Sequence, residues 1–149
     1  MQIRLMLVTV FLSLVVSQTQ AQHGVKLRGS DGWGLGSRYE QYFNKYNQQT
    51  FTGKIAAIDT LAPFREMSYG VQIVIKKDNQ VHTVHLGPGW YIIYQDMGLK
   101  VGNDVEVRGC ETSIEGKKVV MASYVKLSKG ILRLRDEEGI PYWCAWRRE

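Results

Sequence analysis

The order of short segments between residues 51 and 127 constrains the fold of this 149-residue chain most strongly. Apolar–polar alternation or β-branched composition marks five segments as strands, at residues 51–59, 69–77, 81–86, 104–110 and 117–127. After the third segment, Gly87-Pro88-Gly89 ends the strand, and residues 90–97 carry apolar side chains at helical spacing. The sequence therefore predicts three strands, a short helix that plugs one open end of the sheet, and two further strands.

This order is that of a small, mainly β fold, a five-stranded barrel of the OB type with a short helix between strands three and four. Beyond the fifth strand, residues 131–135 are expected to form an edge strand, and the aromatic tail over residues 140–146 is expected to pack back on the barrel. Residues 131–149 are therefore interpreted as a packed C-terminal extension. Because a barrel of this kind hosts many ligands, the pattern predicts the fold and not the ligand.

The first 21 residues have the features of a secretory signal peptide. Arg4 precedes an apolar run over residues 5–16, and Thr19 and Ala21 supply small residues before a cleavage site. The run is shorter than the roughly 20 residues that a membrane-spanning helix needs. The sequence thus predicts a periplasmic or secreted protein with no stable membrane span after signal cleavage.

Two further segments precede the first predicted strand. Residues 22–36 are rich in glycine and are expected to form a flexible lead. Ser37 and Glu40 form a capping box that predicts the start of a helix over residues 37–48. One side of this helix would carry an aromatic stripe, made of Tyr39, Tyr42, Phe43 and Tyr46. We expect the stripe to dock on the barrel, within a single domain over residues 37–149; a stripe left exposed for a partner is the alternative.

Cys110 and Cys144 are the two cysteines of the chain. In an exported protein they are candidates for a disulfide bond that would pin the C-terminal tail. Two separate buried thiols, or one reactive thiol, are the alternatives. Their spacing excludes a CxxC redox motif and a four-ligand zinc cluster.

No pattern in the sequence predicts catalysis, a metal site or a cofactor. His82 and His85 are three residues apart in a predicted strand, so they face opposite sides and do not share one ion. His85 is expected on the outer face, in a structural hydrogen bond. The motifs GxSxG and HExxH are both absent. We therefore expect a non-catalytic protein.

Several segments carry a resemblance to known proteins, at residues 46–58, 67–71, 84–92 and 134–143. They include the motif His-Leu-Gly-Pro from His85 and the motif Arg-Asp-Glu from Arg135. In these segments the chain resembles a family of small exported bacterial proteins with an OB-like barrel, loosely labelled as DNA-binding, to which the magnetosome protein MamS is related. The resemblance implies the same fold and export, and it supplies no catalytic residue.

Two binding hypotheses follow from the surface chemistry. The net charge is +5, and basic residues occur in scattered pairs and not in a run that would indicate a nucleic-acid or lipid tail. The first hypothesis is docking of an envelope protein partner or a larger assembly, because aromatic and arginine side chains are favoured anchors. The second is binding of nucleic acid or an anionic glycan on the barrel face. The candidate binding residues are Tyr91, Tyr94, Arg133, Arg135, Trp143, Trp146 and His85. For each aromatic, core packing is the competing interpretation.

Overall fold

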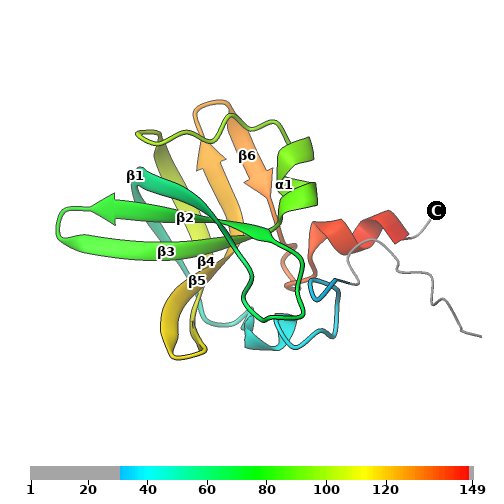
Figure 1. Cartoon of the computed structure of the whole chain (residues 1–149). Helices are drawn as coiled ribbons and strands as arrows, with labels where there is room; N and C mark the ends of the chain where they lie inside the picture. The colour runs from blue at the N-terminus through cyan, green and yellow to red at the C-terminus, as the bar shows by residue number, and fades with distance from the viewer. Residues whose placement is uncertain (1–30, 148–149) are drawn as a thin grey trace, which may run out of the picture.

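Six strands and one short α-helix form the described part of the computed structural model, which covers residues 31–147 (Figure 1). The strands are β1 Gln48–Leu61, β2 Gly70–Lys77, β3 Gln80–Pro88, β4 Asp104–Ile114, β5 Lys117–Leu127 and β6 Gly130–Arg133. The helix α1 Gly89–Tyr94 lies between β3 and β4, and the 3-10 helices η1 Glu40–Tyr42 and η2 Tyr142–Arg147 flank the sheet. The predictions of a mainly β fold and of the helix between strands three and four are confirmed.

Some sequence predictions lie outside this range. The predicted signal peptide, residues 1–21, and the first part of the predicted lead are outside the described residues, as is the side chain of Trp146. Within residues 31–147, no helix is both long enough and apolar enough to cross a membrane.

The strands pair in the order β3-β2-β1-β4-β5-β6, and an additional pairing joins β3 to β5. The neighbours in this order are antiparallel, whereas β3 and β5 pair in parallel where Val84 and His85 meet Val120 and Met121. The succession β1-β2-β3-β5-β4 therefore returns to β1. Near its C-terminal end, β5 exchanges β3 for β6 as its neighbour.

The long strand β1 pairs with two neighbours, β4 and β2. Residues 48–54 pair with β4, residues 54–61 pair with β2, and the register with β2 shifts between Ile55 and Ala57. A bulge of this kind bends the strand, which lets one strand join two parts of a curved sheet. Gly53 lies at this crossing, where a Cβ atom would come within 2.8 Å of the Lys76 carbonyl oxygen.

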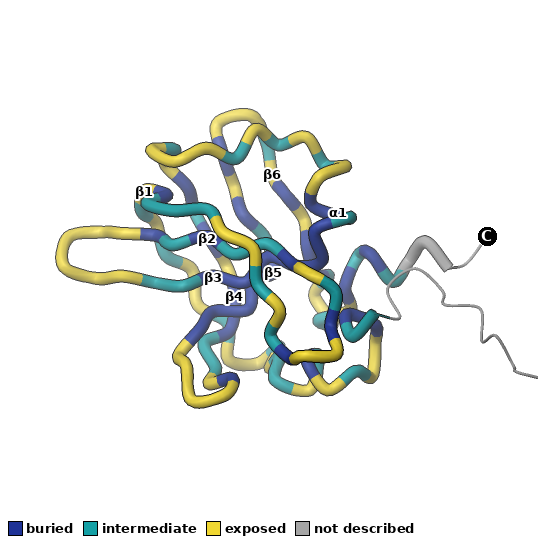
Figure 2. The backbone as a smooth tube through the Cα atoms, viewed as in Figure 1, coloured by how far each residue is buried: buried dark blue, intermediate teal, exposed yellow. Residues whose placement is uncertain are grey.

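The core lies inside the curved sheet, and alternate strand residues reach it (Figure 2). Its fully buried members include Ile73, Ile75, Leu86, Val107 and Met121. β5 is buried over most of its length, because it has strands on both sides.

The helix predicted over residues 37–48 is wrong in extent, since only the three residues of η1 are helical. One half of the predicted capping box forms, because the Glu40 amide donates to Ser37 Oγ at 3.3 Å, while the Glu40 carboxylate pairs with Arg135. However, β1 already begins at Gln48, which pairs with Cys110, so pairing with β4 outweighs local helix propensity. The aromatic stripe divides as a result: Tyr39 is buried, whereas Tyr46 is 88% exposed.

The short helix α1 contacts the core with part of the apolar stripe that the sequence places over residues 90–97. Trp90 and Met97 pack against the core and Tyr91 and Ile92 are buried, whereas Ile93 and Tyr94 are mainly exposed. The Tyr91 hydroxyl donates to the Arg133 carbonyl at 3.0 Å, and this bond fixes the orientation of the helix against the end of β6.

The described end of the glycine-rich lead also contributes to the core. Trp33 is completely buried, and its Nε1 donates to the Ser68 carbonyl oxygen at 2.9 Å. A Cβ atom on Gly70 would come within 2.5 Å of this indole ring, so the close fit depends on a glycine there. Residues that the sequence assigned to a flexible segment thus cover one side of the sheet.

Candidate functional site

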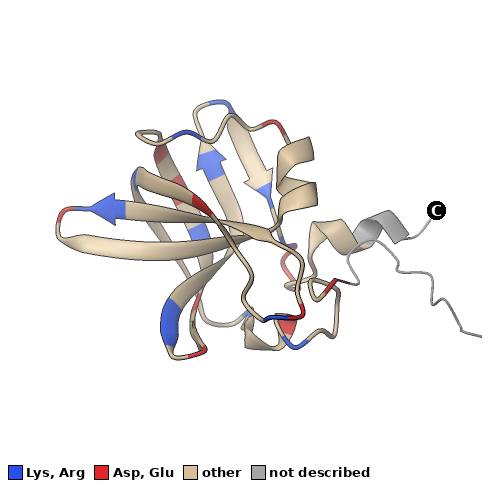
Figure 3. Cartoon of the chain, viewed as in Figure 1, with Lys and Arg blue, Asp and Glu red and all other residues tan. Residues whose placement is uncertain are grey.

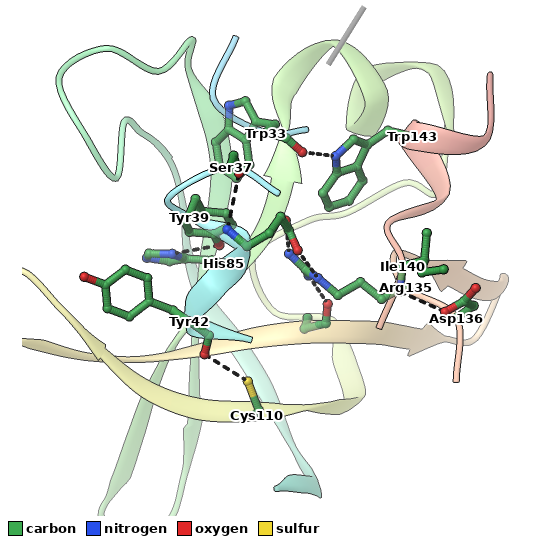
Figure 4. A network of polar contacts seen from close by, with 12 residues as sticks. Trp33, Ser37, Tyr39, Tyr42, His85, Cys110, Arg135, Asp136, Ile140 and Trp143 are labelled. Carbon is green, nitrogen blue, oxygen red and sulfur yellow. Dashed lines mark hydrogen bonds and ion pairs between the residues drawn. The ribbon is translucent and has the colours of Figure 1, made fainter. Parts of the chain in front are cut away.

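A buried ion pair joins the N-terminal segment to the C-terminal segment (Figure 4). Arg135, just after β6, donates from Nη2 and Nε to the two carboxylate oxygens of Glu40, at 2.9 and 3.3 Å. Its Nη1 donates to the Ala122 carbonyl of β5 at 2.6 Å. The Arg135 side chain is fully buried, so the sequence hypothesis of Arg135 as a surface anchor is not what the structure shows.

Aromatic rings complete the surroundings of this guanidinium. The Arg135 guanidinium carbon lies 4.9 Å from the ring centre of Phe43 and 5.2 Å from that of Trp143. Trp143 is itself fully buried, and its Nε1 donates to the Trp33 carbonyl oxygen at 2.7 Å. Core packing, the competing interpretation for the tail aromatics, therefore holds for Trp143. The expectation that the tail packs back on the sheet is met by this residue.

His85 lies on the outer face of β3, as predicted, since it is opposite the half-buried Gln72 and alternates with the core residue Val84, but it is buried there beside the same network. The N-terminal segment covers that face of β3, and the Tyr39 hydroxyl is hydrogen-bonded to His85 Nδ1 at 3.2 Å. The structural hydrogen bond that the sequence suggested is thus present. Burial, with a smaller contribution from the charge of Arg135, lowers the pKa of His85 to about 4.

This shift predicts a loss of stability in acid. The unfolded chain binds a proton at His85 near pH 6.5 and the folded chain only near pH 4, so the free energy of unfolding falls as the pH drops through this window. The lowered pKa of His85 changes the free energy of unfolding by about 3 kcal/mol across this window. Urea unfolding between pH 4 and 7 measures it. Relative to the wild type, His85→Gln should flatten the slope, and an unchanged slope in this variant contradicts the assignment.

A cleft of about 570 Å³ opens on the outer side of this network, and we call it the β4–β6 cleft. Arg135 and Ser123 lie at its buried side, and Gln48 is hydrogen-bonded to the Ser123 hydroxyl there. The strand side carries Arg108, Tyr124 and Arg133, and the opposite side carries Lys45, Asp136, Glu137 and Tyr142. The cleft therefore combines charges of both signs with two tyrosine rings.

Sheet register places the strand side of the cleft in one row. Arg108 of β4 is opposite Tyr124 of β5, and Tyr124 is opposite Arg133 of β6. Directly opposed residues in neighbouring strands point to the same face, so the tyrosine ring stands between two guanidinium groups. Both arginines are exposed, and within residues 31–147 neither makes an ion pair. The Tyr124 hydroxyl donates to Glu106 at 2.9 Å.

The opposite side of the cleft is a turn that carries acidic groups. Asp136 Oδ1 accepts from the amides of Glu138 and Ile140, at 2.9 and 2.8 Å, which holds the turn in shape. Glu138 pairs with Lys45, whereas the exposed Glu137 has no ion-pair partner within the described chain. In Figure 3, basic and acidic segments are interspersed along the strands and turns.

A larger hollow of about 730 Å³ lies where β1, β4 and the end of β5 approach the β2–β3 turn. Its lysines are partly engaged, because Lys54 pairs with Asp104 and Lys77 donates to Thr52 Oγ1. No aromatic side chain lines it. The β4–β6 cleft is therefore the better candidate for a recognition site.

The structure brings together few of the predicted site residues. Arg133 and Arg135 both line the cleft, Arg135 from its buried side, and Tyr94 is exposed on α1, whereas Tyr91 is buried against β6. Sequence reasoning missed Arg108 and Tyr124. Alternation along β4 is consistent with Arg108 on the outer face, but only the pairing register reveals that Arg108 and Tyr124 are neighbours.

The two cysteine sulfurs are not joined in this structure, so the predicted disulfide is absent from it. Cys110 is buried, its Sγ accepts from the Asn44 amide at 3.3 Å, and burial raises the pKa of its thiol. This matches the alternative of a buried structural thiol for Cys110. Among the described residues, no group of three or more His, Cys, Asp or Glu side chains gathers to hold a metal ion.

The fold and the cleft define a small, mainly β protein with a cleft on its sheet that is lined by charged and tyrosine side chains. Residues 47–132 match the model of the MamS/MamX magnetosome protein family. The chain therefore belongs to this family, which confirms the relationship that the sequence motifs suggested.

Two solved structures share a distant similarity with the chain. One is a crystal structure of Rim1, the mitochondrial single-stranded DNA binding protein of S. cerevisiae, with 13% identity and a TM-score of 0.44 over 56% of this chain and 95% of that chain. A selenomethionine-labelled form of the same protein gives 13% identity and a TM-score of 0.43, over 59% of this chain and 96% of that chain. No curated protein sequence matches the chain.

Proposed function

We propose that this chain is a non-catalytic binding module, exported to the cell envelope and associated with the magnetosome, that docks a protein partner at the β4–β6 cleft. Family membership supports the magnetosome association. The apolar N-terminal run supports export. The partner is an envelope protein or a larger assembly that presents acidic side chains to the two arginines.

The architecture proposed for this module is an OB-type barrel. The return of the strand order β1-β2-β3-β5-β4 to β1 supports it, as does the helix between β3 and β4. In this interpretation β6 and the tail are additions that build the cleft on one side of the barrel.

The observation that carries the proposal is the row Arg108–Tyr124–Arg133. Tyrosine and arginine are the residue types that contribute most to protein interfaces, because they bury a large area and form directed hydrogen bonds. Two exposed guanidinium groups without ion-pair partners in the described chain are open to carboxylates of a partner.

The acidic side of the cleft favours a protein over a polyanion. A nucleic acid or an anionic glycan would bring like charge against Glu137 and Asp136, which costs free energy. A protein surface can present acidic groups to Arg108 and Arg133 and basic groups to Glu137. Binding of nucleic acid or glycan on the barrel face is the second candidate, and exposed cations beside Tyr124 are the feature that favours it.

Reversing the charge of the arginine row should abolish capture of the partner. The double substitution Arg108→Glu/Arg133→Glu is expected to reduce affinity for the partner at least about 100-fold, since interface charge pairs contribute roughly 2–5 kcal/mol when one member is lost. Affinity purification from envelope extract, followed by titration with the captured protein, measures the change.

A matched control separates this effect from net charge. Lys76→Glu/Lys100→Glu makes the same charge change on exposed residues outside the cleft and should leave capture unchanged. Equal loss in both variants would contradict docking at the cleft. Binding of nucleic acid or glycan, the second candidate, is tested by titrating the chain with a thymidine 20-mer and with heparin at low salt. Tight binding that weakens steeply as salt is added would favour a polyanion as the ligand.

A further inference from the structure

The β2–β3 and β4–β5 hairpins point away from each other beyond the place where β3 and β5 pair (Figure 1). Pairing between β3 and β5 is confined to Val84 and His85 on one strand and Val120 and Met121 on the other. A groove of about 290 Å³ lies between the diverging strands, bounded by residues 80–83 and 118–120 together with Glu111. None of these residues lines the β4–β6 cleft.

Register shows which backbone groups of β3 face this groove. Asp78 and Asn79 form a two-residue turn, and Lys77 pairs with Gln80 directly beside it. In a hairpin of this kind, the pair beside the turn exchanges hydrogen bonds, and hydrogen-bonded pairs then alternate with non-bonded pairs. The next pair, Lys76 with Val81, is therefore non-bonded. The amide and carbonyl of Val81 point away from β2 and into the groove.

The same reasoning applies to β5 on the other side. Glu115 and Gly116 form the two-residue turn, and Ile114 pairs with Lys117 beside it. The following pair, Ser113 with Lys118, is non-bonded, so the amide and carbonyl of Lys118 point away from β4. No strand of the described chain pairs with β3 at Val81 or with β5 at Lys118 on this side.

We propose that this groove binds a short extended peptide segment of a partner protein, which adds to the sheet at the β3 edge. An extended backbone supplies donors and acceptors at the spacing of an exposed strand, which no other common ligand does. The Val81 side chain is 58% exposed beside this edge and offers an apolar contact for one side chain of the segment. The charges of Lys118 and Glu111 are paired with each other at 2.9 Å, so the groove does not select a polyanion.

Proline at position 81 tests the proposal, because it removes the amide that faces the groove and spares the pairing with β2. Proline is tolerated at an edge position whose amide makes no ladder bond. The probe is a phage-displayed library of random heptapeptides, selected on the purified wild-type chain. Selected peptides should bind Val81→Pro about ten-fold or more weakly, which corresponds to the loss of about one backbone hydrogen bond.

Two controls make the result decisive. Val81→Thr keeps the amide and the branched side chain and should retain peptide affinity, and a thermal unfolding curve must show that Val81→Pro folds. Hydrogen exchange at the Val81 and Lys118 amides should slow when a selected peptide is added. The proposal is overturned if no peptide is enriched, if Val81→Pro binds as the wild type does, or if a thymidine 20-mer displaces the peptides.

Discussion

Replacing Arg135 by methionine is expected to lower the free energy of unfolding by about 3–5 kcal/mol. The substitution leaves the Glu40 carboxylate buried with no opposing charge, and it removes the bond to the Ala122 carbonyl. Because Glu40 lies in η1 and Arg135 follows β6, the N-terminal segment would also lose one of its attachments to the C-terminal segment, beside those of Trp33 to Trp143 and of Lys45 to Glu138. Urea unfolding at pH 7 measures the change.

Two comparisons isolate the buried charge as the cause. The double variant Glu40→Met/Arg135→Met removes both charges and should be more stable than Arg135→Met alone, since apolar pairs can replace buried ion pairs. Lys54→Met breaks an ion pair whose partners are both largely exposed, and its effect should stay below about 1 kcal/mol. If Arg135→Met costs no more than Lys54→Met, the network does not stabilise the fold.

Trp143→Ala is expected to have a similarly large effect, about 3–5 kcal/mol. The indole is fully buried, its ring contacts Tyr91 at 5.5 Å between centres, and its Nε1 binds the Trp33 carbonyl oxygen. Removing it leaves a cavity beside Gly87, where a Cβ atom would come within 2.7 Å of the ring. The loss is measured by chemical unfolding with intrinsic fluorescence and circular dichroism as coincident probes.

Tyr94→Ala is the matched control for the aromatic substitutions. Tyr94 is 70% exposed, so its removal should change the free energy of unfolding by less than about 0.5 kcal/mol. A small effect of Trp143→Ala, comparable with that of Tyr94→Ala, would mean that the tail is not part of the core.

The strands were predictable because each carries its own local pattern. The turns at Asp78-Asn79 and Glu115-Gly116 separate alternating segments, and the structure places two-residue turns at both. Strand ends were less predictable: β4 extends to Ile114, past the expected end at Cys110, because pairing with β5 continues to the turn. Cross-strand pairing, and not local composition, sets these limits.

The roles of the candidate residues were not predictable in the same way. Arginine and tryptophan make the same kinds of contact in a buried network as at an interface. The sequence alone therefore does not distinguish the two roles for Arg135 and Trp143, and their burial decides. The partner that neutralises Arg135 is Glu40, 95 residues away along the chain. Arg108 and Tyr124 are not predicted as neighbours for a related reason, because a single sequence does not specify the register between strands.

The helix over residues 37–48 shows the opposite error, in which a correct local signal was extended too far. The cap between Ser37 and Glu40 exists, yet the chain leaves the helical path after η1. The Glu40 carboxylate does not bond to the Ser37 amide but pairs with Arg135. From Gln48 onward the chain pairs with β4 as strand β1. Tertiary contacts decide between helix and strand here.

Site-specific photo-crosslinking in the native cells tests the central claim, that the β4–β6 cleft is the docking surface for a protein partner. A benzophenone amino acid replaces Tyr124 in the cleft, or the half-exposed Tyr69 outside it as the control. We predict a discrete protein adduct from position 124 that is absent from position 69 and is lost when Arg108→Glu is added. No adduct from position 124, or the same adducts from both positions, would contradict the claim.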